Sequence, residues 1–145
     1  MVKWLLAAIA LALAGLFFWS KVQSNSRLKV GNSVVKVEIR DDQVGRSLGL
    51  SGREGLGENE GMLFIFNSPA IYEFWMKDMN FPLDFVWIQD GKVVDLSEHI
   101  PAPDKLTNEP PMTVRPDSSV TQVLEVNSGW VEKNRIKVGD LVKML

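Results

Sequence analysis

The first feature of the chain is an uninterrupted apolar run at its start. Residues 4–19 read WLLAAIALALAGLFFW and contain no charged side chain, and only Gly15 is not clearly hydrophobic. A helix over residues 4–20 would extend roughly 25 Å, which approaches the ~30 Å hydrocarbon core of a bilayer. Trp4 and Trp19 stand at its two ends, where amphipathic rings favour the membrane interface. The run therefore predicts an N-terminal transmembrane helix that attaches the protein to a membrane through residues 4–20.

Two other interpretations of this run stay open. One is a signal peptide cleaved at Ala12-Leu13-Ala14, which would release the remainder as a secreted protein. The other is a buried core helix, although the run has no polar face to turn toward solvent. A signal anchor that leads with Lys3 predicts a domain facing the periplasm or the cell exterior.

Beyond a polar linker over residues 21–27, the pattern becomes that of β-strands. Residues 34–40 alternate between apolar and polar side chains, which predicts a strand with one buried face. Continuous apolar runs over residues 61–66 and 83–89 predict strands that are buried on both faces. Asp90-Gly91 is a hairpin turn signal. Further strands are predicted at residues 71–76, 92–96, 120–126 and 137–144.

Helix signals are short and depend on capping residues. Asp41 or Asp42 is an N-cap candidate for a helical turn that ends at Leu48. Ser128 is an N-cap candidate for a second turn over residues 129–134. Both segments are too short to form a helical layer, so the strands determine the fold class.

These elements divide the chain into two regions. Residues 1–26 form the signal anchor with a short linker, and residues 27–145 form a single β-rich domain. The predicted fold is mostly β: a compact β-sandwich or rolled β-barrel with one or two short helices, preceded by one N-terminal transmembrane helix. Five of the seven prolines fall within residues 99–118, so this segment is either a functional loop or a stiff surface connection.

Composition removes several classes of chemistry. The 145 residues include no cysteine and one histidine, which excludes disulfides, thiolate nucleophiles, lipid attachment to cysteine and sites that need two imidazoles. The net charge is −2, and we expect no nucleic-acid partner. Asp95, Glu98 and His99 make a poor ligand set, so we predict no metal and no cofactor.

Aromatic residues gather in one part of the domain, because eight of its nine aromatics fall within residues 64–87. We expect most of them in the core. The consecutive residues 74–76, however, place bulky groups on both faces of a strand, so this strand is either covered on both sides or carries an exposed aromatic patch. Asp84 lies among apolar residues, and a structural role is expected: a salt bridge to Lys77, Arg46 or Arg53, or a cap of the turn at Pro82.

Three blocks of sequence carry a family resemblance. They are GMLFIF with FWMKDMNFPLD over residues 61–84, the preceding segment from Arg46 to Leu56, and VLEV with Gly129 followed by IKVGD at residues 136–140. In this order they resemble the bacterial and archaeal family called domain of unknown function 192. The resemblance implies a compact β-rich domain, often exported or membrane-tethered, with no assigned activity. The motif residues that we take as candidates for a ligand site are Arg53, Trp75, Lys77, Asp84 and Glu125.

Three functions are compatible with these residues. We expect a membrane-tethered binding module for an envelope polymer, a peptide or a protein, with no catalytic residues. The first alternative is a hydrolase-type enzyme that uses Asp84 with Glu125 or His99 as acid and base. The second alternative is a structural envelope assembly protein in which the same residues belong to the core.

Overall fold

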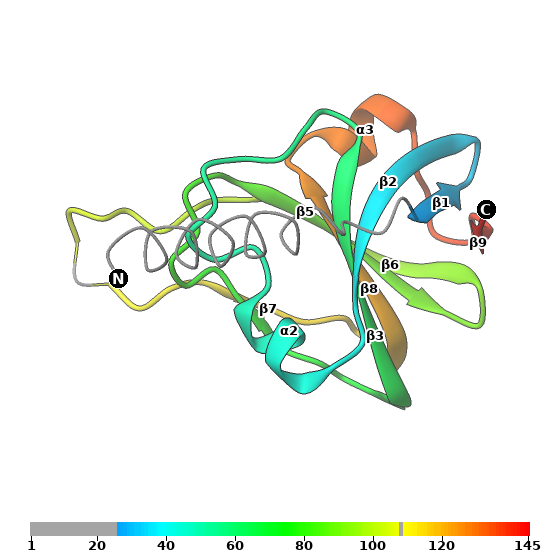
Figure 1. Ribbon diagram of the computed structural model, residues 1–145, viewed down its shortest axis with the longest axis horizontal. Coiled ribbons are helices and arrows are strands. Elements are labelled where there is room, and N and C mark those ends of the chain that lie inside the picture. Colours follow the sequence, from blue (N-terminus) through cyan, green and yellow to red (C-terminus); the bar gives the residue numbers. More distant parts are fainter. Residues whose placement is uncertain (1–25, 108) are drawn as a thin grey trace, which may run out of the picture.

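The computed structural model describes residues 26–107 and 109–145. Within them, seven strands form one curled sheet in the order β6-β5-β8-β3-β2-β1-β9, and two short strands pair as β4-β7 (Figure 1). The strands of the large sheet are β1 Ser26–Val30, β2 Ser33–Arg40, β3 Glu60–Ala70, β5 Leu83–Gln89, β6 Lys92–Ile100, β8 Val120–Asn127 and β9 Val142–Met144. The small sheet has β4 Phe74–Trp75 and β7 Thr113–Val114, and the two helices are α2 Gln43–Leu48 and α3 Trp130–Asn134.

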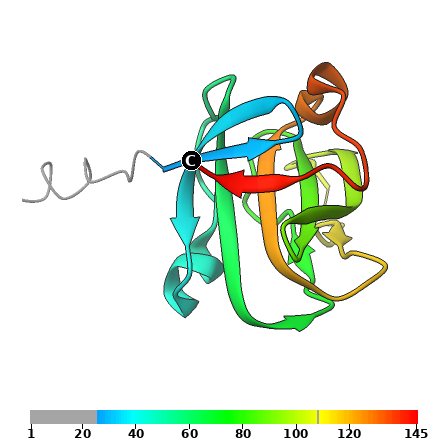
Figure 2. The same ribbon diagram turned by 90° about the vertical axis from the view of Figure 1, so that its right-hand side faces the viewer.

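The sheet curls until its two edges meet, as the end-on view shows (Figure 2). All neighbouring strands are antiparallel except β2 and β3, which are parallel and connected through α2. At the closing edge, the amide of Val93 donates to Asp140 O at 2.9 Å and the amide of Val142 donates to Gly91 O at 2.8 Å. The mostly β fold is confirmed, and of the two predicted architectures, a β-sandwich and a rolled β-barrel, the curled half-barrel sheet is nearer to the second.

Alternating side chains send two apolar clusters to the two faces of the sheet. Leu124 and Val126 of β8 lie in one cluster with residues of β1 and β5, which the curl encloses. Val123 of the same strand lies in the other cluster, with the aromatic residues of β3 and β5. This second cluster is covered by α2, the β4-β7 pair and their loops rather than by a second large sheet.

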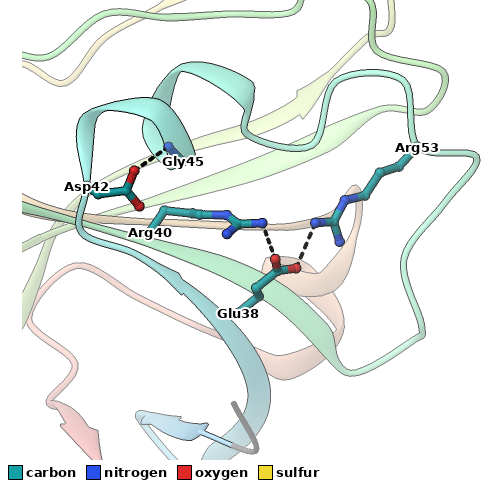
Figure 3. Close-up of polar contacts among 5 residues, drawn as sticks. All are labelled: Glu38, Arg40, Asp42, Gly45 and Arg53. Atoms are coloured by element: carbon teal, nitrogen blue, oxygen red, sulfur yellow. Dashed lines mark hydrogen bonds and ion pairs between the residues drawn. The ribbon is translucent and has the colours of Figure 1, made fainter. Parts of the chain in front are cut away.

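Most predicted elements are confirmed. Strands occupy residues 34–40, 61–66, 83–89, 92–96 and 120–126, and the turn at Asp90-Gly91 adopts positive φ at both residues. Asp42 caps α2 as predicted, because its carboxylate accepts a 2.8 Å hydrogen bond from the amide of Gly45 (Figure 3). Trp130 packs inward with 3 % of its surface exposed.

Other predictions need correction. The strand expected at residues 71–76 forms only at Phe74–Trp75, and the one expected at 137–144 begins only at Val142. Ser128 does not cap α3: Gly129 is the N-cap residue and has no side chain to accept a hydrogen bond, and the carboxylate of Asp84 accepts the amide of Val131 instead. The linker expected up to residue 27 is shorter, because β1 already begins at Ser26.

The predicted membrane segment at residues 4–20 lies outside the described residues. Among residues 26–107 and 109–145, no helix has the length and apolar character needed to span a bilayer.

Candidate functional site

Glu125 is a carboxyl group placed in the middle of an apolar face. Its register partners are Met62 on β3 and Phe85 on β5, and register partners point to the same side of a sheet. Only 6 % of Glu125 is exposed. In the part of the chain that the structure describes, no donor hydrogen-bonds to its carboxyl oxygens. Burial therefore raises the pKa of Glu125 to about 8, although the positive charge of Arg53 opposes the shift.

A narrow cavity leads from Glu125 to the surface. It encloses about 30 Å³, and its walls include the side chains of Phe64, Phe74 and Leu83. Its outer rim is formed by Trp75 and by residues 46–51 of α2 and the following turn. The volume suffices for a water molecule or a group of similar size. A small polar group in the cavity would meet a carboxyl that is mostly protonated at pH 7.

A wider groove adjoins this cavity. It encloses about 310 Å³ between α2 and the segment from Phe66 to Trp75. Arg46, Ser47, Phe74 and Trp75 line both spaces, so the two lie side by side. We refer to the two adjoining spaces, with Glu125 lining the narrow one, as the α2–β4 groove.

The rim of the α2–β4 groove exposes large apolar side chains. Trp75 is 59 % exposed and Leu48 is 64 % exposed, whereas Met76 is fully buried. Of the two arrangements predicted for residues 74–76, the exposed aromatic is the one that occurs. The ammonium of Lys77 lies 5.1 Å from the ring centroid of Trp75, which places a cation beside the exposed indole.

The floor of the groove is stiffened by stacked rings. Phe66 and Tyr72 stack with their centroids 3.6 Å apart, and the guanidinium of Arg46 lies 5.1 Å over the Phe66 ring. Arg46 also donates to Ile65 O at 3.0 Å, which ties α2 to β3. The groove is thus preformed rather than assembled from free side chains.

Arg53 reaches the same face of the sheet from the loop after α2. Glu38, the register partner of Met62, accepts a hydrogen bond from Arg53 at 2.7 Å and pairs through its other oxygen with Arg40 (Figure 3). The side-chain amide of Asn80 holds the loop by donating from Nδ2 to Arg53 O at 2.8 Å. Arg53 therefore lies between a carboxylate that it neutralises and the buried Glu125, whose ionised form it favours.

Asp84 is not part of this site. Its register partner is Val126, so it points to the face opposite Glu125, which is the face of Val86 and Ile88. It is completely buried, and its oxygens accept the amides of His99 at 2.8 Å and Val131 at 3.0 Å. The expected partners Lys77, Arg46 and Arg53 are replaced by backbone donors, and the acid–base pair of Asp84 with Glu125 does not form.

The structure thus gathers Arg53, Trp75, Lys77 and Glu125 around one face and leaves Asp84 on the other. The groove residues Leu48, Phe66 and Tyr72 were not predicted as site residues. For Leu48, the sequence signal was its spacing of four residues from Val44, which places two apolar side chains on one side of a short helix; both are exposed in the structure. Among residues 26–107 and 109–145, no cluster of three or more acidic or imidazole side chains could hold a metal ion.

Comparison with known proteins places the chain among its relatives. Residues 26–144 match the model of the DUF192 family, described as "Uncharacterized ACR". The chain belongs to this family. No curated protein matches the chain.

Two crystal structures resemble this DUF192 domain. One is a candidate transcription regulator from Sinorhizobium meliloti 1021, with a TM-score of 0.73 and 26% identity over 82% of this chain and 92% of that chain. The other is a protein of unknown function from Novosphingobium aromaticivorans DSM 12444, with a TM-score of 0.71 and 27% identity over 81% of this chain and 83% of that chain. The two structures agree with this chain in fold, and the family model gives the family, which is uncharacterised.

Proposed function

We propose that this DUF192 domain is a binding module that recognises a peptide segment of a partner protein in the α2–β4 groove. The observation that carries the proposal is the buried Glu125 at the inner end of a groove whose rim exposes Trp75. Trp, Tyr and Arg dominate the energetics of protein interfaces, and the groove presents Trp75, Tyr72 and Arg46 together.

The chemistry of Glu125 favours an uncharged group of the ligand. A protonated carboxyl presents one O–H donor and one carbonyl acceptor side by side. This pair matches an amide or a hydroxyl, whereas a charged group would have to be desolvated in the apolar cavity. The apolar rim at Leu48 and Trp75 would contact the adjoining side chain of the peptide.

The last part of the proposal is the location of the domain. The apolar run over residues 4–20 supports a membrane anchor, with the domain in the periplasm or at the cell exterior, or a secreted domain if the run is a cleaved signal. Either location brings the groove to exported proteins. An envelope polymer is the competing ligand class, and the outcome of the test separates the two.

The test uses the full-length chain in detergent micelles with a phage-displayed peptide library and a glycan array. We expect peptides selected on the wild type to lose at least about tenfold in affinity on Trp75→Ala or Leu48→Ala. The matched control is Leu141→Ala, because Leu141 is 66 % exposed at the closing edge of the sheet, away from the groove. Peptides that bind both rim variants as tightly as the wild type, or glycans alone as ligands, would contradict the proposal.

A further inference from the structure

Three polar side chains meet on the opposite face of the sheet from the α2–β4 groove, where Asp84 points. His99 is the penultimate residue of β6, Ser128 precedes α3, and Glu132 lies in α3, which Figure 1 shows on the far side of the sheet from α2. The Nδ1 atom of His99 lies 3.0 Å from the hydroxyl of Ser128. The Nε2 atom of the same ring lies 3.8 Å from a carboxylate oxygen of Glu132. The imidazole is therefore placed between a hydroxyl and a carboxylate.

One buried carboxylate fixes the two segments that carry these groups. Asp84 holds the amide of His99 with one oxygen and the amide of Val131 with the other, and it has no exposed surface. The first bond positions the end of β6, and the second positions the start of α3. Asp84 thus sets the distance between the imidazole and Ser128 without touching either side chain.

The backbone conformation of His99 is a second indication that this residue is held in place by its surroundings. His99 has φ +55°, a conformation that residues other than glycine adopt rarely and that concentrates at functional sites. Gly129 lies beside the ring, and a Cβ at Gly129 would be 3.9 Å from His99 Cε1. The bond from the His99 amide to Asp84 holds the residue in this conformation.

We propose that Ser128 is a nucleophile and His99 its general base, for the hydrolysis of accessible carboxylic esters. A hydroxyl in hydrogen-bond reach of an imidazole, which a third group orients, is the arrangement that activates a serine. In the tautomer that the proposal requires, the proton is on Nε2, 3.8 Å from a carboxylate oxygen of Glu132, and the Nδ1 lone pair is left to accept the proton of Ser128. Glu132 and Asp84 are positioning residues. The proposal does not rest on the groove or its ligand.

The reaction balances with water as the only co-reactant. Ser128 Oγ attacks the carbonyl carbon of the ester while Nδ1 of His99 takes the hydroxyl proton. The bond between that carbon and the leaving oxygen then breaks, and the alcohol leaves with the proton. Water attacks the acyl-serine in the same way, which releases the acid and restores the Ser128 hydroxyl. The His99 side chain is 58% exposed, so the site suits small or protruding esters.

The first experiment treats the full-length chain in micelles with 4-nitrophenyl acetate and locates the acetyl group by mass spectrometry. We expect an acetyl group on Ser128 and nitrophenolate release at least about a hundredfold faster than in Ser128→Ala, the lower end of the usual range for general-base assistance. Ser128→Ala retains His99, so it also measures the reaction of the free imidazole. His99→Asn should lose the same factor, since Asn tolerates positive φ. Ser119→Ala, an exposed serine elsewhere, should react like the wild type.

The second experiment reads the imidazole directly, because His99 is the single histidine of the chain. Nitrogen NMR at mildly alkaline pH should show the proton on Nε2 in the wild type. Glu132→Gln should increase the Nδ1-protonated form and slow the acetylation of Ser128 without lowering the free energy of unfolding, an effect that a purely structural role would not produce. An acetyl group absent from Ser128, equal rates for Ser128→Ala and wild type, or a wild-type proton on Nδ1 would each overturn the proposal.

Discussion

Two buried carboxyl groups on neighbouring strands of this sheet, Asp84 and Glu125, differ in their hydrogen bonds. Asp84 has no exposed surface and accepts two backbone amides, whereas Glu125 is 6 % exposed and faces apolar side chains. Glu125 pairs in register with Phe85, the residue after Asp84. Successive residues of a strand point to opposite faces, so the two carboxyl groups lie on opposite faces of the sheet. Burial is nearly equal, so the hydrogen bonds decide the difference: one carboxyl belongs to the framework, and the other is left to titrate near a cavity.

Removal of the Asp84 carboxylate should have the largest effect on the free energy of unfolding. Asp84→Ala leaves two buried amides without acceptors, and we expect a loss of about 3–5 kcal/mol in the free energy of unfolding. Urea denaturation of the full-length chain measures the loss. Asp95→Ala is the matched control, because Asp95 also accepts two backbone amides but is only half-buried.

The control variant should lose only about 1 kcal/mol, because water can replace its hydrogen bonds. Asp84→Asn should fall between the two, since it keeps one acceptor oxygen. Equal losses for the two alanine variants would show that burial of Asp84 adds nothing to its hydrogen bonds.

The next test uses the pH dependence of stability. The pKa of Glu125 rises from 4.5 to about 8 on folding, so the unfolded chain releases this proton first as pH increases. The contribution of Glu125 is therefore intact below about pH 4.5 and is lost as pH rises toward 8. We expect this group to lower the free energy of unfolding by about 3–4 kcal/mol between pH 5 and pH 8.

Glu125→Gln, which stays neutral, should remove this slope and be more stable than the wild type at pH 8. Arg53→Gln removes the opposing positive charge and should raise the pKa of Glu125 further. Urea titrations at several pH values check both variants. If wild type and Glu125→Gln share one pH profile, the carboxyl of Glu125 is solvated in a way that its burial does not indicate.

The smallest expected effect concerns a carboxylate at the surface. Asp42 hydrogen-bonds the amide of Gly45 in solvent, which lowers its pKa, and it begins the helix that forms one wall of the groove. Asp42→Ala should cost about 1 kcal/mol, the usual value of an N-cap. Asp41→Ala is the neighbouring control and should change the free energy of unfolding by less than about 0.5 kcal/mol. A loss for Asp42→Ala as large as that for Asp84→Ala would erase the distinction between surface and buried carboxylates.

Local patterns predicted the parts of the molecule that depend on local chemistry. Alternation and apolar runs gave β2, β3, β5 and β8, and the cap at Asp42 gave α2. Segment 71–76 has the composition of a strand, but only Phe74 and Trp75 find a partner, because β7 offers two residues between stretches of a proline-rich loop. A strand needs a neighbour as well as a propensity.

The site was harder to predict because its geometry is non-local. Trp75 and Glu125 were selected from their motifs, but the groove that joins them depends on where α2 packs. The face of Asp84 followed from alternation, whereas its donors lie 15 and 47 positions away at His99 and Val131. A periodic pattern does not reveal contacts between residues so far apart in the sequence, so the salt bridge expected for Asp84 was wrong.

The pairing of β1 with β9 has a consequence for the order of folding. Leu28 pairs with Met144, so the first described strand cannot gain its outer neighbour until nearly the whole chain is available. Contacts of such long sequence separation form slowly, because a large loop must close first. During synthesis the curl therefore stays open until residues 142–144 are available to pair with β1. Without β9 the chain should still collapse, but the closing edge of its sheet, where β9 pairs with β1, should unfold readily.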